Sequence, residues 1–145
     1  VQSLPITGAV IVSTPQNIAL ADARKGVNMF QQDSINVPVL GLIENMSWFT
    51  PEELPDNKYF IFGNEGAKHL AAQLEVPLLG QIPLVQSIRE SGDVGRPAIL
   101  QETTPNAIAF KEMTDKVIEQ IDQRNETLAP TEVVKVEYGA PKCSS

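Results

Sequence analysis

The stretch VPVLGLIENMSWF (residues 37–49) decides how the rest of the chain is interpreted. Residues 37–43 are almost all aliphatic, and Glu44 and Asn45 then interrupt the run before two aromatic residues. A continuous apolar run, rather than an alternating one, predicts a strand that is covered on both faces. The polar residues that follow predict a sharp turn at the carboxyl end of this strand, where open α/β sheets bind their ligands.

Two further apolar runs, GAVIVST (8–14) and VPLLGQIPL (76–84), predict two more buried strands. Helical spacing of apolar residues predicts helices over 15–31, 63–74 and 104–124, and a Thr-Pro pair marks the start of the first and the last. The order is therefore βαβαβα. It predicts an α/β fold of the doubly wound kind, with a parallel sheet and right-handed crossovers.

The remaining segments are polar. Residues 50–59 contain two prolines and three acids and predict a surface loop, and residues 85–97 predict a loop with about one helical turn. Residues 126–145 show little periodicity, although apolar and polar residues alternate over 132–138, which could pair as an edge strand. We therefore expect one domain over residues 1–124 and a loosely structured tail over 125–145.

Composition excludes several classes of protein. The chain has 145 residues, a net charge of −7 and a single cysteine, Cys143. One cysteine excludes an internal disulfide framework and a metal site built from several thiolates of one chain, and it suits a reducing, cytoplasmic compartment. The negative charge argues against binding a nucleic-acid backbone. No run of about eighteen apolar residues is present, so we expect no membrane span.

The first residues, VQSLPITGAVIVS, enter a strand without an initiator methionine, and three strands are few for a sheet of this kind. Both features predict either a fragment of a longer protein or a processed chain.

The three loops at the carboxyl ends of the predicted strands, 13–16, 44–47 and 81–84, should lie on one edge of the sheet. The carboxamide of Asn45 can match the donor and acceptor of an adenine base, or it can simply turn the chain. Pro83 can lie against a flat base or simply end its strand. The motifs GxxxxGK[ST], HExxH, CxxC and GxSxG are absent from the chain, so no catalytic residue and no metal ligand is assigned.

Four blocks of this sequence together resemble one family. They are TGAVIVSTPQNIALADARKGVNMF (7–30), VPVLGLIENMSWF (37–49), YFIFGNEGAKHLA (59–71) and VPLLGQIPLVQSIRESGDVGRPAI (76–99). In this order and spacing they are similar to the C-terminal half of the Mrp (ApbC-like) P-loop ATPases, which are iron–sulfur cluster carriers related to MinD and ParA. The resemblance covers about residues 1–121.

The resemblance implies a doubly wound P-loop domain whose phosphate loop and Mg-binding aspartates precede residue 1. It implies that Asn45 contacts the adenine of ATP and that Pro83, Leu84 and Val85 lie near the base. A complete protein of this kind would hydrolyse ATP with Mg, form a homodimer and serve iron–sulfur apo-proteins. This chain would bind its own N-terminal half and would be inactive alone.

The chain departs from the family at one place. Members that carry a cluster usually have a CxxC shortly after the ENMS block, and two chains share the four thiolates. Here that place reads WFTPEELPDNKYFIFG (48–63), without cysteine, which argues against a cluster at that place. Two alternatives remain open: a partner-docking module that uses residues 50–59 with Trp48 and Phe49 while nucleotide binding is vestigial, and a nucleotide sensor without hydrolysis.

Overall fold

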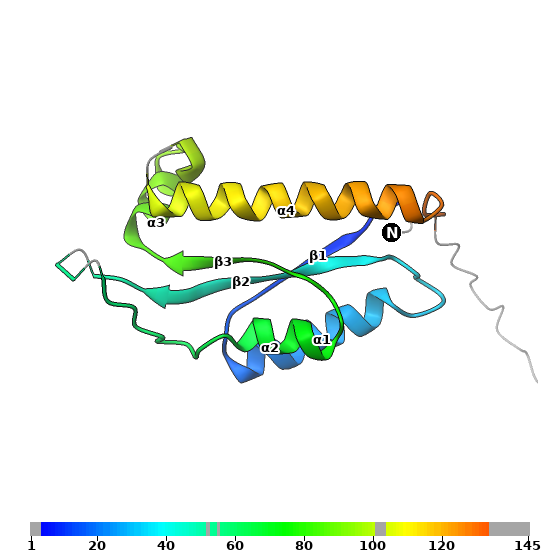
Figure 1. Cartoon of the computed structure of the whole chain (residues 1–145), viewed down its shortest axis with the longest axis horizontal. Coiled ribbons are helices and arrows are strands. Elements are labelled where there is room, and N and C mark those ends of the chain that lie inside the picture. Colours follow the sequence, from blue (N-terminus) through cyan, green and yellow to red (C-terminus); the bar gives the residue numbers. More distant parts are fainter. Residues whose placement is uncertain (1–3, 52, 55, 101–103, 134–145) are drawn as a thin grey trace, which may run out of the picture.

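A three-stranded parallel sheet with helices on both faces forms the computed structural model, which describes residues 4–51, 53, 54, 56–100 and 104–133 (Figure 1). The strands lie in the order β1–β2–β3. Their bounds are Ala9–Ser13 (β1), Val39–Phe49 (β2) and Leu78–Leu84 (β3). The helices are α1 (Asn17–Phe30), α2 (Gly66–Gln73), α3 (Gln86–Asp93) and α4 (Pro105–Thr127), with a 3₁₀ turn at Ala98–Leu100.

The core has two layers, one on each face of the sheet. Figure 1 shows α4 along one face and α1 with α2 on the other. Leu42 is fully buried beneath α1 and α2, whereas its neighbour Ile43 packs into the cluster under α4. Successive side chains of a strand point to opposite faces, so an uninterrupted apolar run fills both layers. The predicted α/β fold with a parallel sheet is therefore confirmed.

Strand β2 is longer than the sequence suggested. It continues through the expected turn at Glu44 and ends at Phe49. The pairing with β3 shifts within this stretch, because Asn45 pairs with Ile82 while the next pair is Phe49 with Leu84. Met46 adopts a left-handed conformation with φ of 57°. The polar residues thus form an irregularity inside the strand, and the prediction that the strand ends at residue 43 was wrong.

Two helices also differ from expectation. Residues 86–93 form the helix α3, where a loop with one helical turn was predicted. Helix α4 ends at Thr127 rather than at residue 124. The predicted edge strand 132–138 falls mostly outside the described residues.

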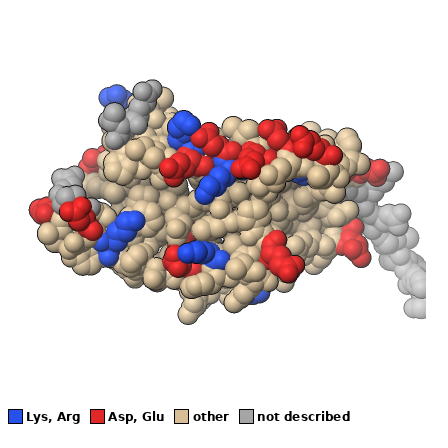
Figure 2. Space-filling view, in the orientation of Figure 1, with Lys and Arg blue, Asp and Glu red and all other residues tan. Residues whose placement is uncertain are grey.

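Charge is distributed unevenly over the molecule. Acidic side chains gather over α4, at the top of Figure 2. This face is poorly suited to a nucleic-acid backbone, which binds to clustered lysine and arginine. Within the described part of the chain, no helix is both long and apolar enough to span a bilayer.

Candidate site at the carboxyl edge of the sheet

A row of three polar residues crosses the sheet at its carboxyl edge. Ser13 of β1 pairs with Glu44 of β2, and Glu44 pairs with Gln81 of β3. Ser13 and Glu44 are buried, and Gln81 is half-buried. Each member of this row begins a short segment at the carboxyl edge of the sheet, and these three segments, 13–16, 44–47 within β2 and 81–85 at the end of β3, are called the rim.

Glu44 is the most unusual member of this row because its side chain is 0% exposed. Its Oε2 accepts a hydrogen bond from the backbone N–H of Ala67 at 2.7 Å, and its Oε1 accepts one from Nε2 of Gln81 at 2.8 Å. Ala67 is the second residue of α2, so the carboxylate lies at the positive end of that helix. No lysine, arginine or histidine among the described residues forms an ion pair with it.

From the sequence, Glu44 was expected in a turn, and its buried hydrogen-bonded role was missed. The available signal was a carboxylate at the end of a fully apolar run, in a strand expected to be covered on both faces. A charge in such a place must find buried hydrogen-bond donors, because an unpaired buried charge is costly.

Asn45 directly follows Glu44 and is half-buried. Its Oδ1 accepts a hydrogen bond from the backbone N–H of Met46 at 3.0 Å, and the hydroxyl of Ser47 donates to the carbonyl oxygen of Glu44 at 3.0 Å. The Nδ2 of Asn45 donates no hydrogen bond to any residue that the structure describes. The carboxamide is thus oriented by its own backbone and keeps a free donor.

Asn45 lines a groove of about 570 Å³ together with β1, Thr14 and the inner side of α1. It is the groove's one contribution from β2; the other lining residues are Val10, Ile11, Val12, Ser13, Thr14, Ala19, Asp22, Ala23 and Gly26.

Pro83, Leu84 and Val85 lie at the end of the neighbouring strand. Asn45 pairs with Ile82, the residue before Pro83, so Asn45 and Pro83 share one edge of the sheet. Pro83 is buried, while Leu84 and Val85 are half-buried. Val85 then forms the N-cap of α3 without a side-chain cap. Contact of these residues with a base stays a prediction.

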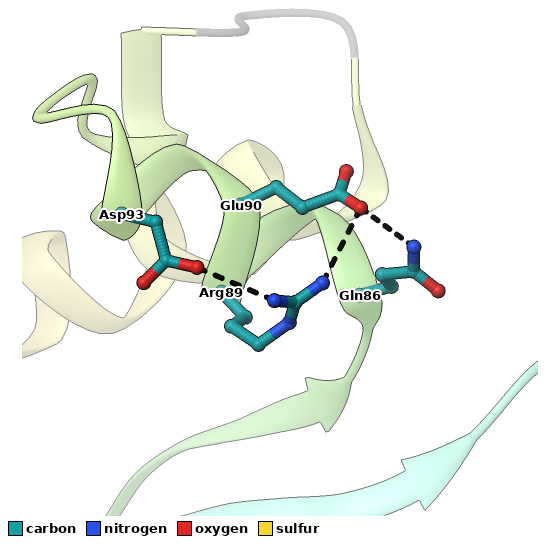
Figure 3. A network of polar contacts seen from close by, with 4 residues as sticks. All are labelled: Gln86, Arg89, Glu90 and Asp93. Carbon is teal, nitrogen blue, oxygen red and sulfur yellow. Dashed lines mark hydrogen bonds and ion pairs between the residues drawn. The ribbon is translucent and has the colours of Figure 1, made fainter.

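Helix α3 carries a small polar network beside the rim (Figure 3). Gln86 donates to Glu90 at 2.6 Å, and Arg89 reaches Asp93 at 3.3 Å and Glu90 at 3.5 Å. All four side chains are exposed, whereas Ile88 packs toward the core. Such pairs stabilise a helix by about 0.2–0.5 kcal/mol each, so the network supports α3 locally rather than forming a catalytic group.

The described residues do not fit an iron–sulfur cluster. They contain no group of three or more histidine, cysteine, aspartate or glutamate residues that could hold a metal ion. The single cysteine, Cys143, lies outside them. Where the family's thiolates would be expected, Phe49 pairs with Tyr59 and the Lys58 ammonium lies 4.0 Å from the ring centroid of Trp48. Iron–sulfur clusters are ordinarily held by cysteine thiolates, which this stretch does not contain.

The chain is similar in sequence to proteins named for iron–sulfur cluster transfer. The ParA family model, described as NUBPL iron-transfer P-loop NTPase, matches residues 1–118. The chain is 48% identical to the iron-sulfur cluster carrier protein of Synechocystis over 113 residues, which are 78% of the chain and 31% of that protein. It is 45% identical to the iron-sulfur cluster transfer protein NUBPL of Dictyostelium discoideum over 122 residues, 83% of the chain and 37% of that protein. The chain thus spans less than half the length of these relatives.

Solved structures share the same architecture. A nucleotide-binding protein of Archaeoglobus fulgidus in complex with ADP superposes with a TM-score of 0.57 at 32% identity, covering 72% of this chain and 40% of that one. MinD of Pyrococcus horikoshii complexed with Mg-ADP gives a TM-score of 0.59 at 22% identity, covering 81% and 44%. At 22% identity, the similarity to MinD concerns the fold alone.

Proposed function

The chain belongs to the family of NUBPL iron-transfer P-loop NTPases, and from this premise we propose that it forms the base-binding side of an ATP site. In this proposal the full-length gene product binds and hydrolyses ATP with Mg, acts as a homodimer and passes iron–sulfur clusters to apo-protein clients. The chain's own contribution is to hold the base, while the phosphates are gripped outside it, because the chain contains no GxxxxGK[ST] loop.

The observation that supports this proposal most directly is the state of Asn45. Its side chain lies where the regular pairing of β2 with β3 ends, and it lines the groove beside β1. Its Oδ1 is turned toward the N–H of Met46, so the Nδ2 donor has one defined direction. A fixed donor with an adjacent acceptor is what an adenine edge requires.

The end of β3 supplies the second part of the proposed base site. Pro83 follows the residue that pairs with Asn45, and Leu84 and Val85 are half-buried beside it. An apolar surface next to a single polar contact suits a flat, mostly apolar base.

In this proposal the cluster is cargo, and its thiolate ligands are not supplied by residues 48–63. The described residues therefore serve the nucleotide rather than the cluster. The isolated 145-residue chain is expected to release no phosphate from ATP.

The test is the substitution Asn45→Ala in the full-length gene product, with ATP affinity measured by calorimetry. We expect binding to weaken by about 1–3 kcal/mol, the usual effect of leaving buried polar groups unpaired. Affinity for inorganic tripolyphosphate should not change, because it has no base. Asn28→Ala, at an exposed position of α1, is the matched control and should leave both affinities unchanged. An unaltered ATP dissociation constant in Asn45→Ala would refute the base contact.

A further inference from the structure

We propose that Glu44 is the positioning residue of the rim: its buried carboxylate joins the three segments of the rim and sets the direction in which Asn45 is presented. This inference rests on the proposed function, since it concerns how that base contact is held in place.

The Glu44 carboxylate lies where the core would accept an apolar side chain. Glu44 is fully buried, and its charge is compensated by one backbone N–H, one side-chain amide and the start of α2 rather than by a cation. Removing a carboxylate from water is costly, and even a buried ion pair can often be replaced by apolar residues of similar volume without loss of stability. Stability of the fold therefore does not explain why a carboxylate is here.

The Glu44 carboxylate connects all three parts of the rim. Glu44 lies within β2, and through Gln81 it holds the strand that leads to Pro83. Through Ala67 it holds the start of α2. That start is pressed against the loop after β1, because a Cβ added to Gly66 would lie 2.5 Å from the carbonyl oxygen of Pro15.

Glu44 also holds the stretch of backbone that carries Asn45. Regular pairing of β2 with β3 breaks after Asn45, which pairs with Ile82, and returns at Phe49, which pairs with Leu84. Between these two pairs the chain advances four residues along β2 but two along β3. Backbone pairing therefore does not hold residues 46–48. Glu44 holds this stretch instead. Its side chain is anchored on α2, and its carbonyl oxygen accepts a hydrogen bond from the hydroxyl of Ser47. Fixing the backbone of Glu44 and Ser47 in this way sets the direction of Asn45, which lies between them.

The test compares variants of the full-length gene product by their affinities for ATP and for inorganic tripolyphosphate. Glu44→Ala should weaken ATP binding by about 5- to 150-fold, as Asn45→Ala does, and should leave tripolyphosphate binding unchanged. Glu44→Gln should stay within about twofold of the wild type, because its oxygen can accept from Ala67 and its amide can donate to Gln81 once the Gln81 amide turns over.

The decisive measurement is the double variant Glu44→Ala with Asn45→Ala. If Glu44 acts through Asn45, the double variant should bind ATP no more than about twofold more weakly than Asn45→Ala alone. Additive losses, or an equal loss of tripolyphosphate binding, would show a general disturbance and overturn the inference.

A milder variant covers the case in which Glu44→Ala does not fold. Gln81→Ala removes one arm of the network at a half-buried position and should weaken ATP binding by about 2- to 10-fold, again without adding to Asn45→Ala. Unchanged ATP binding in Gln81→Ala, together with a normal loss in Asn45→Ala, would count against the inference alone. Unchanged binding in Asn45→Ala would instead refute the proposed base contact.

Discussion

Gly66, the first residue of α2, lies against the carbonyl oxygen of Pro15, and a Cβ at Gly66 would sit 2.5 Å from that oxygen. The same Cβ would also lie 2.8 Å from a methyl carbon of Leu20 in α1. The absence of a side chain at Gly66 therefore allows the start of α2 to reach the loop after β1. This approach brings the N–H of Ala67 within reach of the Glu44 carboxylate.

Gly66→Ala should destabilise the protein by about 1–3 kcal/mol, because the added methyl group meets backbone that cannot easily move. Gly92→Ala is the matched control, since Gly92 lies in α3 and a Cβ there meets no atom within 4 Å. The control should be neutral or stabilising by up to about 1 kcal/mol, as alanine is the better helix former. Urea unfolding followed by circular dichroism measures both, and equal midpoints for the two variants would contradict the close approach.

Glu75→Gly should stabilise the protein by about 0.5–1 kcal/mol. Glu75 follows the C-cap of α2, Leu74, in a left-handed conformation with φ of 55°, and the N–H of Val76 donates to the carbonyl oxygen of Ala71 at 3.0 Å. Left-handed backbone costs a residue with a Cβ about 1–2 kcal/mol, and the greater freedom of glycine in the unfolded chain offsets part of the gain. Glu75→Ala keeps the Cβ and should show no comparable increase in the unfolding midpoint.

The contribution of Glu65 to stability should depend on pH. The hydrogen bond from Lys68, at 2.6 Å, holds the pKa of the Glu65 carboxyl below its ordinary value of 4.5. A carboxyl group whose pKa is lower in the folded state adds stability above its unfolded pKa and loses it as the pH falls through the folded value. Glu65→Gln should therefore lower the unfolding midpoint at pH 7.

The difference between Glu65→Gln and the wild type should shrink as the pH falls below 4.5. It should also be smaller in high salt, because the pair is exposed to solvent. Asp33→Asn is the control, since no described cation pairs with Asp33. A difference between Glu65→Gln and the wild type that grows in acid would contradict the direction of the pKa shift.

Much of the fold could be predicted from the sequence, because a strand that is buried on both faces is a continuous run of apolar residues. Residues 37–43 and 76–84 are continuous apolar runs, and both became strands of a parallel sheet. The quoted blocks also identified the family, which the match over residues 1–118 confirms. Helix α3 was missed because its few inward contacts, such as Ile88, are outnumbered by polar residues.

The amino-acid sequence by itself determined the order of elements, the covered parallel sheet and the family, since these follow from local apolar patterns and from blocks of adjacent residues. Only the tertiary structure decided that Glu44 is buried and holds Ala67 and Gln81, which lie 23 and 37 residues away along the chain. The physical reason is that the sequence shows the same glutamate whether its carboxylate lies in a solvent-exposed turn or in a buried network. The donors that distinguish the two are brought to it only when the strands and α2 pack together.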